Sequence, residues 1–199
     1  MVKENAWKGT LSLRLALLAI LTALTTVLTM VISIPIPATQ GYINLGDVGV
    51  FLSGLILGPF GGIAGGVGSA LADYALGYIN YVPITFIVKG LQGTISGIIF
   101  GVWKPFKRFE MRMLLALLVG SVVMVLGYFI AETVIYGVAA AVLEVPGNIF
   151  QVTFGSIVSA IAFLSITRVL GIKANHGISS SYTRWLSPTA MIVGLKAPI

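Results

Sequence analysis

Residues 41–59 read GYINLGDVGVFLSGLILGP, and this stretch decides how often the chain crosses a membrane. Asp47 stands at the start of an apolar run that ends before Gly58. A charge next to hydrocarbon is costly, so it usually binds, conducts or pairs with another group. The run 47–57 has eleven residues, which in a helix reach about 17 Å of a ~30 Å core. We interpret it as a short second helix, and Asn44 and Asp47 as a first indication of a small-molecule site.

The composition is that of an integral membrane protein. The 199 residues are 57% hydrophobic and 9% charged, with a mean hydropathy of +1.03. Soluble domains contain about 25% charged residues, so the composition favours a helical bundle in a bilayer. The chain has no cysteine, and its single histidine is His176. We therefore expect no disulfide, no metal site and no cofactor.

The positions of the positive charges predict the orientation in the membrane. Outside Lys89, the basic residues form three clusters, which are Lys3, Lys8 and Arg14; Lys104, Lys107, Arg108 and Arg112; and Arg168, Lys173, Arg184 and Lys196. The expected outer loops 33–46, 78–82 and 143–147 contain no Lys or Arg. By the positive-inside rule both termini and the 104–112 loop are cytoplasmic. Nucleic acid is not an expected partner, because no single basic face with stacking aromatics is present.

We predict an all-α membrane protein, a bundle of six transmembrane helices with cytoplasmic termini. Prolines and glycines divide the apolar sequence, and the expected helices are about 11–32, 47–57, 60–77, 83–103, 112–142 and 147–171. If residues 47–77 crossed only once, the 104–112 loop would face away from the N-terminus and the charge rule would fail. The bundle is expected to occupy residues 1–174, and the polar tail 175–199 to be poorly ordered.

Small residues at helical spacing mark two of the expected helices. In the third helix, glycines recur four residues apart at 61 and 65 and at 62 and 66. Such pairs let helices approach closely, and we interpret them as packing inside the bundle. The first helix carries Ala16, Ala19 and Ala23. For these alanines two interpretations stay open, internal packing or a docking face for another membrane protein.

Eleven polar side chains in or beside the apolar runs are candidates for binding a ligand: Asn44, Asp47, Asp73, Tyr78, Lys89, Gln92, Tyr128, Glu132, Tyr136, Asn148 and Gln151. Lys89 and Gln92 share one face of their helix, and Glu132 lies between two tyrosines at four-residue spacing. The topology places most of this set in the outer half of the membrane. Glu132 is expected deeper, about ten residues from the outer end of its helix. The set suits the capture of a polar ring from outside.

Several of these residues also have a purely structural interpretation. Lys89 pairs with either Asp73 or Glu132 in that case, and Asp47 is the N-cap of the second helix. Asp73 instead reaches the outer interface. The tyrosines then act as interfacial belt or packed core residues, namely Tyr42, Tyr78, Tyr81, Tyr128 and Tyr136.

Motifs of common enzyme classes are missing. The sequence contains no HExxH, no GxSxG, no Walker A motif and no Cys–His pair. We therefore predict a protein that is not an enzyme. If it drives transport, the energy comes from partner proteins or from an ion gradient.

Five segments together resemble a known family: Ser33-Ile34-Pro35-Ile36-Pro37, Gly41–Asp47, Leu57-Gly58-Pro59, Ala72-Asp73 and Val88-Lys89-Gly90. They resemble the S components of energy-coupling factor (ECF) vitamin transporters, in the subgroup for hydroxymethylpyrimidine, pyridoxine or riboflavin. The resemblance covers roughly residues 10–172 and is most specific over 33–90.

The resemblance implies a six-helix subunit that binds a vitamin or precursor near the outer face. It implies that the loop 34–46 closes over the ligand, and that Ala19 and Ala23 belong to a motif that meets a transmembrane coupling subunit. Two cytoplasmic ATPase subunits supply the energy in this family. A ligand with one ring is favoured, because the deep polar residues are few. The alternatives are a stand-alone proton- or sodium-coupled transporter that uses Glu132 and Asp73, and a membrane scaffold without transport activity.

Overall fold

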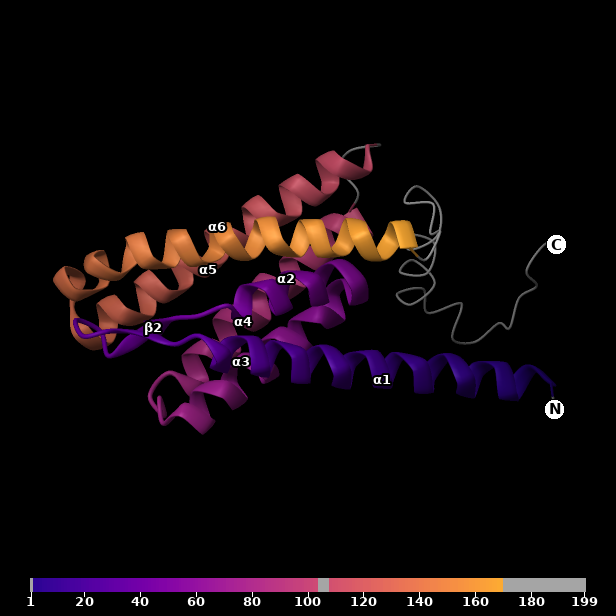
Figure 1. Cartoon of the computed structure of the whole chain (residues 1–199), viewed down its shortest axis with the longest axis horizontal. Coiled ribbons are helices and arrows are strands. Elements are labelled where there is room, and N and C mark those ends of the chain that lie inside the picture. The colour runs from indigo at the N-terminus through magenta and orange to yellow at the C-terminus, as the bar shows by residue number, and fades with distance from the viewer. Residues whose placement is uncertain (1, 104–107, 170–199) are drawn as a thin grey trace.

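Prolines and glycines punctuate the helices of this chain, and the computed structural model describes the result for residues 2–103 and 108–169. The elements in chain order are α1 (Val2–Val31), β1 (Ile34–Ile36), β2 (Gly41–Ile43), α2 (Gly46–Leu57), η1 (Gly58–Phe60), α3 (Gly61–Leu76), α4 (Val82–Gly97), η2 (Ile98–Trp103), α5 (Phe109–Tyr136) and α6 (Val138–Val169). Figure 1 shows the long helices α1, α5 and α6 along the long axis, with the β1–β2 hairpin at the end opposite the start of α1. The tail 175–199, predicted to be poorly ordered, lies outside the described residues.

Five stretches of the described chain are long and apolar enough to cross a membrane: Ser12–Val31, Gly46–Leu76, Val82–Val102, Phe109–Tyr136 and Val138–Val169. The protein is therefore an all-α membrane protein with five candidate transmembrane stretches. Its outer surface is apolar, with Leu143 and Val134 well exposed, whereas Asp47, Lys89 and Glu132 are buried. This inside-out distribution is expected where lipid is the solvent.

The stretch Gly46–Leu76 folds back on itself at the 3₁₀ turn between α2 and α3. A Cβ on Gly61 would overlap the backbone of Ser53, and a Cβ on Gly65 would lie 2.9 Å from Val50. The contact positions descend in α2 as they ascend in α3, so the two short helices pack antiparallel. The expected pair of short helices in this region is present.

The glycines of α3 pack against α4. A Cβ on Gly62 would collide with the carbonyl of Gly90, and one on Gly66 would lie 2.7 Å from the carbonyl oxygen of Phe86. These distances leave no room for any side chain larger than hydrogen at either position. The small-residue spacing in α3 therefore serves internal packing, as the sequence indicated.

The boundary between the last two helices was predicted wrongly. We expected helices over 112–142 and 147–171, with Pro146 at the start of the second, but α6 begins before this proline and continues through it. The chain turns instead at Gly137, whose φ of +87° lies in the left-handed region that glycine adopts without steric cost. A proline is tolerated inside a membrane helix because neighbouring groups satisfy the freed carbonyl.

This shift moves two acidic residues. Glu132 lies about one turn before the end of α5 rather than about ten residues from it. Glu144, assigned to an outer loop from the sequence, lies in the second turn of α6 and is buried. Both carboxylates therefore belong to the outer end of the bundle.

The loop after α1 forms a β hairpin. Ile34 pairs with Ile43 and Ile36 with Gly41 in antiparallel register. The turn between them includes Gln40, whose φ is +57°. The segment is thus a β hairpin that lies across one end of the helices, where we expected a loop.

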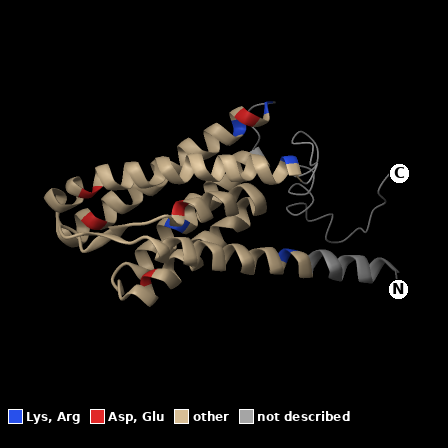
Figure 2. Cartoon of the chain, in the orientation of Figure 1, with Lys and Arg blue, Asp and Glu red and all other residues tan. Residues whose placement is uncertain are grey.

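Charge separates along the bundle (Figure 2). Arg112 lies in the first turn of α5 and Arg168 in the last turn of α6, and Figure 1 places these two helix ends together. Glu132 and Glu144 lie at the opposite ends of the same helices. One end of the described bundle therefore carries the two arginines together with the exposed Glu110, and the other carries the buried acids together with Lys89.

Candidate functional site

Asp47 is the centre of a buried polar cluster that joins three helices. Its Oδ1 accepts hydrogen bonds from Lys89 Nζ and Gln92 Nε2, both at 2.7 Å. Its Oδ2 accepts one from Gln151 Nε2 at 2.5 Å. All four side chains are at least 96% buried. The cluster ties α2 to α4 and α6 beneath the hairpin.

The geometry of this cluster follows from helical spacing and close packing. Lys89 and Gln92 are three residues apart in α4, so both point toward the same side. Gly155 lets α6 approach α2, since a Cβ there would lie 2.5 Å from the Cβ of Asp47. A buried ion pair is stable only when further hydrogen bonds satisfy its atoms, and the two glutamine side chains supply them.

Two structural interpretations of these residues were wrong. Asp47 does not cap α2, because the N-cap residue is Leu45 and no side chain caps the helix there. The carboxylate instead turns inward to the Lys89 ammonium. The lysine, in turn, makes its ion pair with Asp47 rather than with Asp73 or Glu132.

The hairpin is fastened to the helices by side-chain hydrogen bonds. The backbone N–H of Asn44 donates to Gln151 Oε1 at 2.8 Å. The Tyr42 hydroxyl donates to Asp73 Oδ1 at 2.5 Å, and its ring stacks on Tyr78 with 4.3 Å between centroids. Burial, and then the Asp73 charge, raise the pKa of Tyr42. The hydroxyl therefore stays protonated and remains a donor.

The turn of the hairpin is held from the other side. The Thr39 hydroxyl donates to Glu144 Oε2, and the Tyr81 hydroxyl donates to the Thr39 carbonyl at 3.0 Å. Burial raises the pKa of Tyr81, which keeps this donor protonated as well. The Tyr81 ring lies 6.5 Å from the Tyr128 ring and 6.3 Å from the Tyr136 ring. Together these tyrosines form an aromatic wall below the hairpin.

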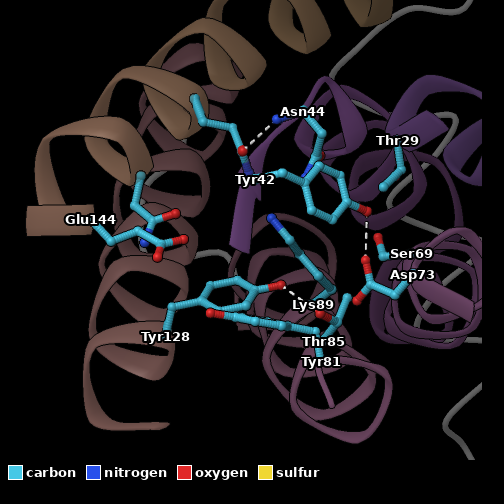
Figure 3. Close-up of a pocket in the computed structure, with 12 residues that line it drawn as sticks. Thr29, Tyr42, Asn44, Ser69, Asp73, Tyr81, Thr85, Lys89, Tyr128 and Glu144 are labelled. Carbon is cyan, nitrogen blue, oxygen red and sulfur yellow. Dashed lines mark hydrogen bonds between the residues drawn. The ribbon is translucent and has the colours of Figure 1, made fainter. Parts of the chain in front are cut away.

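A small closed cavity lies under the hairpin (Figure 3), lined by Thr29, Tyr42, Asn44, Ser69, Asp73, Tyr81, Thr85, Lys89, Tyr128, Glu144, Asn148 and Gln151. Its volume is about 20 Å³, which is room for about one water molecule. In Figure 3, Glu144 and Asp73 lie on opposite sides of Lys89. Polar groups from six elements, which are α1, β2, α3, α4, α5 and α6, therefore converge on one small cavity.

A family model described as "ECF-type riboflavin transporter, S component" matches residues 11–168. This chain belongs to that family. The S component is a multi-pass membrane protein and not an enzyme, and the resemblance found in the sequence is confirmed. The match spans every helix that contributes to the cavity.

Two relatives of this S component are similar along most of their length. An uncharacterized protein of Pyrococcus woesei is 43% identical over 132 residues, covering 65% of this chain and 84% of the relative. The thiamine precursor transporter HmpT of Lactococcus lactis subsp. cremoris (strain MG1363) is 37% identical over 150 residues, covering 74% and 84%. A solved S component of a bacterial ECF transporter aligns with a TM-score of 0.59 at 23% identity, covering 80% of this chain and 98% of that one. The last likeness shows a shared fold.

Eight of the eleven candidate residues lie at or directly behind the cavity of this S component. Six of them line it: Asn44, Asp73, Lys89, Tyr128, Asn148 and Gln151. Asp47 and Gln92 lie behind Lys89 through the hydrogen bonds described above. The structure thus gathers residues from five helices that the sequence could only assign to one half of the membrane.

The other three candidates lie elsewhere at the same end. Tyr78 and Tyr136 line a more open pocket of about 270 Å³, outside the wall formed by Tyr81. Glu132 is fully buried and interacts with Glu144, but it does not line the cavity. These three are neighbours of the site rather than its lining.

Six lining residues were absent from the candidates: Thr29, Tyr42, Ser69, Tyr81, Thr85 and Glu144. A signal existed for Thr29, because Thr22, Thr25 and Thr29 recur along one face of α1. Tyr42 and Tyr81 were interpreted as possible belt aromatics, and Glu144 was assigned to an outer loop. Only the fold shows that these residues face inward.

Proposed function

We propose a ligand for this chain, which is the substrate-binding S component of an ECF importer. The proposed ligand is a vitamin precursor with one ring, of the hydroxymethylpyrimidine type, with pyridoxine and then riboflavin as less favoured ligands. The observation that carries the proposal is the enclosed polar cavity between the hairpin and the helices. The 37% identity to HmpT, named as a thiamine precursor transporter, supports the pyrimidine.

The aromatic wall and the polar lining suit a flat ring. Tyr81 and Tyr128 offer faces for stacking, and Lys89 lies 5.4 Å from the centroid of the Tyr128 ring. Asp73 and Asn148 supply hydrogen-bonding groups on either side. An apolar or aromatic enclosure with a few placed polar groups is the usual form of a small-molecule site. In this proposal the Asp47 cluster fixes the positions of Lys89 and Gln151 rather than contacting the ligand first.

The hairpin acts as the lid in this proposal. The cavity is too small for any ring compound, so the ligand enters when the hairpin moves away from the helices. Its fastenings through Tyr42, Asn44 and Thr39 are single hydrogen bonds, each worth about 1–3 kcal/mol. Breaking and remaking them is a small enough cost for a reversible closure.

We further propose six crossings, with α2 and α3 as two short antiparallel spans and both termini in the cytoplasm. The antiparallel packing of Gly61 on Ser53 supports a hairpin over a single long span. Arg112 and Arg168 at one end of the bundle support a cytoplasmic location of that end. The cavity then opens toward the outside.

The partners proposed are a transmembrane coupling subunit and two cytoplasmic ATPase subunits. Ala16, Ala19 and Ala23 are all exposed on α1, so they do not pack inside the bundle, and they leave a shallow face on which another helix fits. Replacing Ala19 and Ala23 together by leucine should abolish uptake by the complete transporter while ligand binding by the isolated S component stays the same. Unchanged uptake would refute this docking face.

Mass spectrometry of the ligand that co-purifies with the full chain from detergent tests the proposed function. We expect a pyrimidine or pyridine vitamin precursor, retained without nucleotide and without an ion gradient. Equilibrium dialysis with hydroxymethylpyrimidine, pyridoxine and riboflavin provides the second measurement. If none of the three binds below the micromolar range and none co-purifies, the proposed function is wrong.

A further inference from the structure

The buried outer end of the bundle contains more acidic side chains than basic ones. Asp47, Asp73, Glu132 and Glu144 are each at least 97% buried, and Lys89 is the one buried base among them. This base is ion-paired with Asp47 at 2.7 Å. Within residues 2–103 and 108–169, the remaining three carboxyl groups form no salt bridge, although the Lys89 charge also acts on Asp73.

Several acceptor atoms in this region also have no hydrogen bond. They are Asp73 Oδ2, both carboxyl oxygens of Glu132, and Gln92 Oε1, and all are buried in the described structure. The Ser69 hydroxyl, which lines the cavity, is unpaired too. Buried polar atoms are satisfied in the great majority of cases, so a cluster of exceptions needs an explanation. Nearly all of the unpaired atoms named here are oxygens that can accept a hydrogen bond.

The donors around the cavity are largely occupied. The amide nitrogens of Gln92 and Gln151 donate to Asp47. The hydroxyl groups of Thr85 and Tyr128 hydrogen-bond to each other at 3.0 Å. Among the groups that line the cavity, Asp73 Oδ2 and the Ser69 hydroxyl have no hydrogen bond, so the cavity offers a ligand an unoccupied carboxylate acceptor.

Acidic side chains flank the cavity on two sides. Figure 3 shows Asp73 from α3 on one side and Glu144 from α6 on the other, with Lys89 between them. Glu132 on α5 interacts with Glu144 but does not line the cavity. A ligand in the cavity thus meets carboxylate oxygens at two separate points.

We propose that Asp73 and Glu144 recognise a hydrogen-bond-donating edge of the ligand, such as a ring amine, and that the site rejects anionic ligands. The proposal rests on the proposed function and deepens it by naming the chemical class that the cavity accepts. An amine supplies the donor that Asp73 Oδ2 lacks, and a protonated amine also balances the charge. A phosphorylated ligand would meet the two acids that line the cavity, Asp73 and Glu144, in a medium of low dielectric constant.

A matched set of ring compounds tests this selectivity on the purified full chain in detergent. The probes are hydroxymethylpyrimidine with its ring amine, the same ring with hydrogen in place of the amine, and riboflavin. We expect the loss of the amine to weaken binding by about tenfold or more, because hydrogen bonds to a charged acceptor are lost. Equal binding of the two pyrimidines, or tighter binding of riboflavin, would overturn the amine assignment.

The variant Glu144→Gln tests whether the carboxylate is responsible. The glutamine keeps an oxygen for the Thr39 hydroxyl but loses the charge, so the preference for the aminated pyrimidine should fall toward unity. Thr39→Val removes the same hydrogen bond to the lid but keeps the acid, and it should weaken both pyrimidines equally. Glu110→Gln, at an exposed position at the other end of α5, should change neither. A preference that persists in Glu144→Gln contradicts the proposal.

The outcomes distinguish failure of the proposed function from failure of the amine recognition alone. If no ring compound binds, the proposed function fails. If riboflavin or the ring without its amine binds well while the aminated ring does not, the chain remains a vitamin-binding S component and the amine recognition by Asp73 and Glu144 is wrong. A thermal melt of each variant shows whether a loss of binding reflects loss of the fold.

Discussion

Two buried polar clusters lie within one end of this bundle, and they are built from the same kinds of residue. The cluster around Asp47 has a base, two amides and short hydrogen bonds on both carboxylate oxygens. The cluster of Asp73, Glu132 and Glu144 has no base and leaves three carboxylate oxygens unpaired. Hydrogen bonds on both oxygens of Asp47 suit a group that stabilises the fold, whereas the unpaired carboxylate oxygens of the second cluster need another explanation, which in this account is ligand binding. Burial of a charge therefore does not distinguish scaffold from site, but its hydrogen-bond partners do.

The largest effect is expected at the satisfied cluster. Asp47→Ala leaves the Lys89 ammonium buried without its counter-ion, and the variant should lose about 3–5 kcal/mol of stability. Thermal unfolding of the detergent-solubilised protein measures the change. Asp47→Leu combined with Lys89→Met should recover part of the loss, because no unpaired charge remains. Equal stability of Asp47→Ala and the wild type would contradict the scaffold assignment.

The next largest effect is expected at Gln151, the side chain that connects α6 to the hairpin. Gln151→Leu removes the hydrogen bond to Asp47 and the one from the Asn44 N–H, at a cost of about 2–3 kcal/mol. The variant should also exchange the amide of Asn44 with solvent faster than the wild type does. Hydrogen exchange measured by mass spectrometry reports both the loss of stability and the faster exchange of the Asn44 amide. Unaltered protection of the hairpin would show that Gln151 does not hold it.

A smaller effect is expected where the lid meets the unsatisfied cluster. Tyr42→Phe keeps the stacking on Tyr78 but loses the hydrogen bond to Asp73, at a cost of about 1.5 kcal/mol. If the hairpin is the lid, the bound vitamin precursor should dissociate about tenfold faster while its association rate changes little. Stopped-flow displacement measures both rates. An unchanged dissociation rate would place the lid contact elsewhere.

The smallest effect on stability is expected at Glu132. Because both of its carboxyl oxygens are unpaired, Glu132→Gln removes an acid that forms no salt bridge with a described residue. The variant should be as stable as the wild type, or more stable by up to about 1 kcal/mol. Its melting temperature is the measurement, with Asp47→Asn as the matched charge removal at the satisfied cluster. A loss at Glu132 as large as that at Asp47 would erase the contrast between the clusters.

The sequence was sufficient for the membrane class, the family and the short helical pair. Composition and charge clusters predict the membrane class, and the spacing of glycine and proline predicts the short helical pair. The α5–α6 boundary was missed because Pro146 is a strong local signal, and nothing in a single sequence shows that the membrane helix continues through it. Gly137, which makes the turn, is one of 24 glycines, and its left-handed φ is visible only in the structure.

The site was predicted in part. Polar residues in apolar runs are rare enough to be found by inspection, which located Asp73, Lys89 and Gln151. The pairing of Lys89 with Asp47 was missed because it depends on how closely α4 approaches α2, where a Cβ on Gly54 would lie 2.8 Å from the carbonyl oxygen of Gly93. Glu144 was missed because the last helix was predicted to begin at residue 147, whereas α6 begins at Val138. Tertiary packing, rather than local pattern, decides which acid is satisfied and which remains available.

Isothermal titration of the purified full chain with aminated hydroxymethylpyrimidine tests the central claim most directly. The account predicts saturable binding of one ligand per chain below the micromolar range, weakened about tenfold or more in Glu144→Gln and unaffected in Glu110→Gln, with both variants melting near the wild type. Binding of undiminished strength in a folded Glu144→Gln variant would contradict the claim that the acids lining the cavity recognise the ligand. The absence of binding to the wild type would contradict the assignment of the ligand itself.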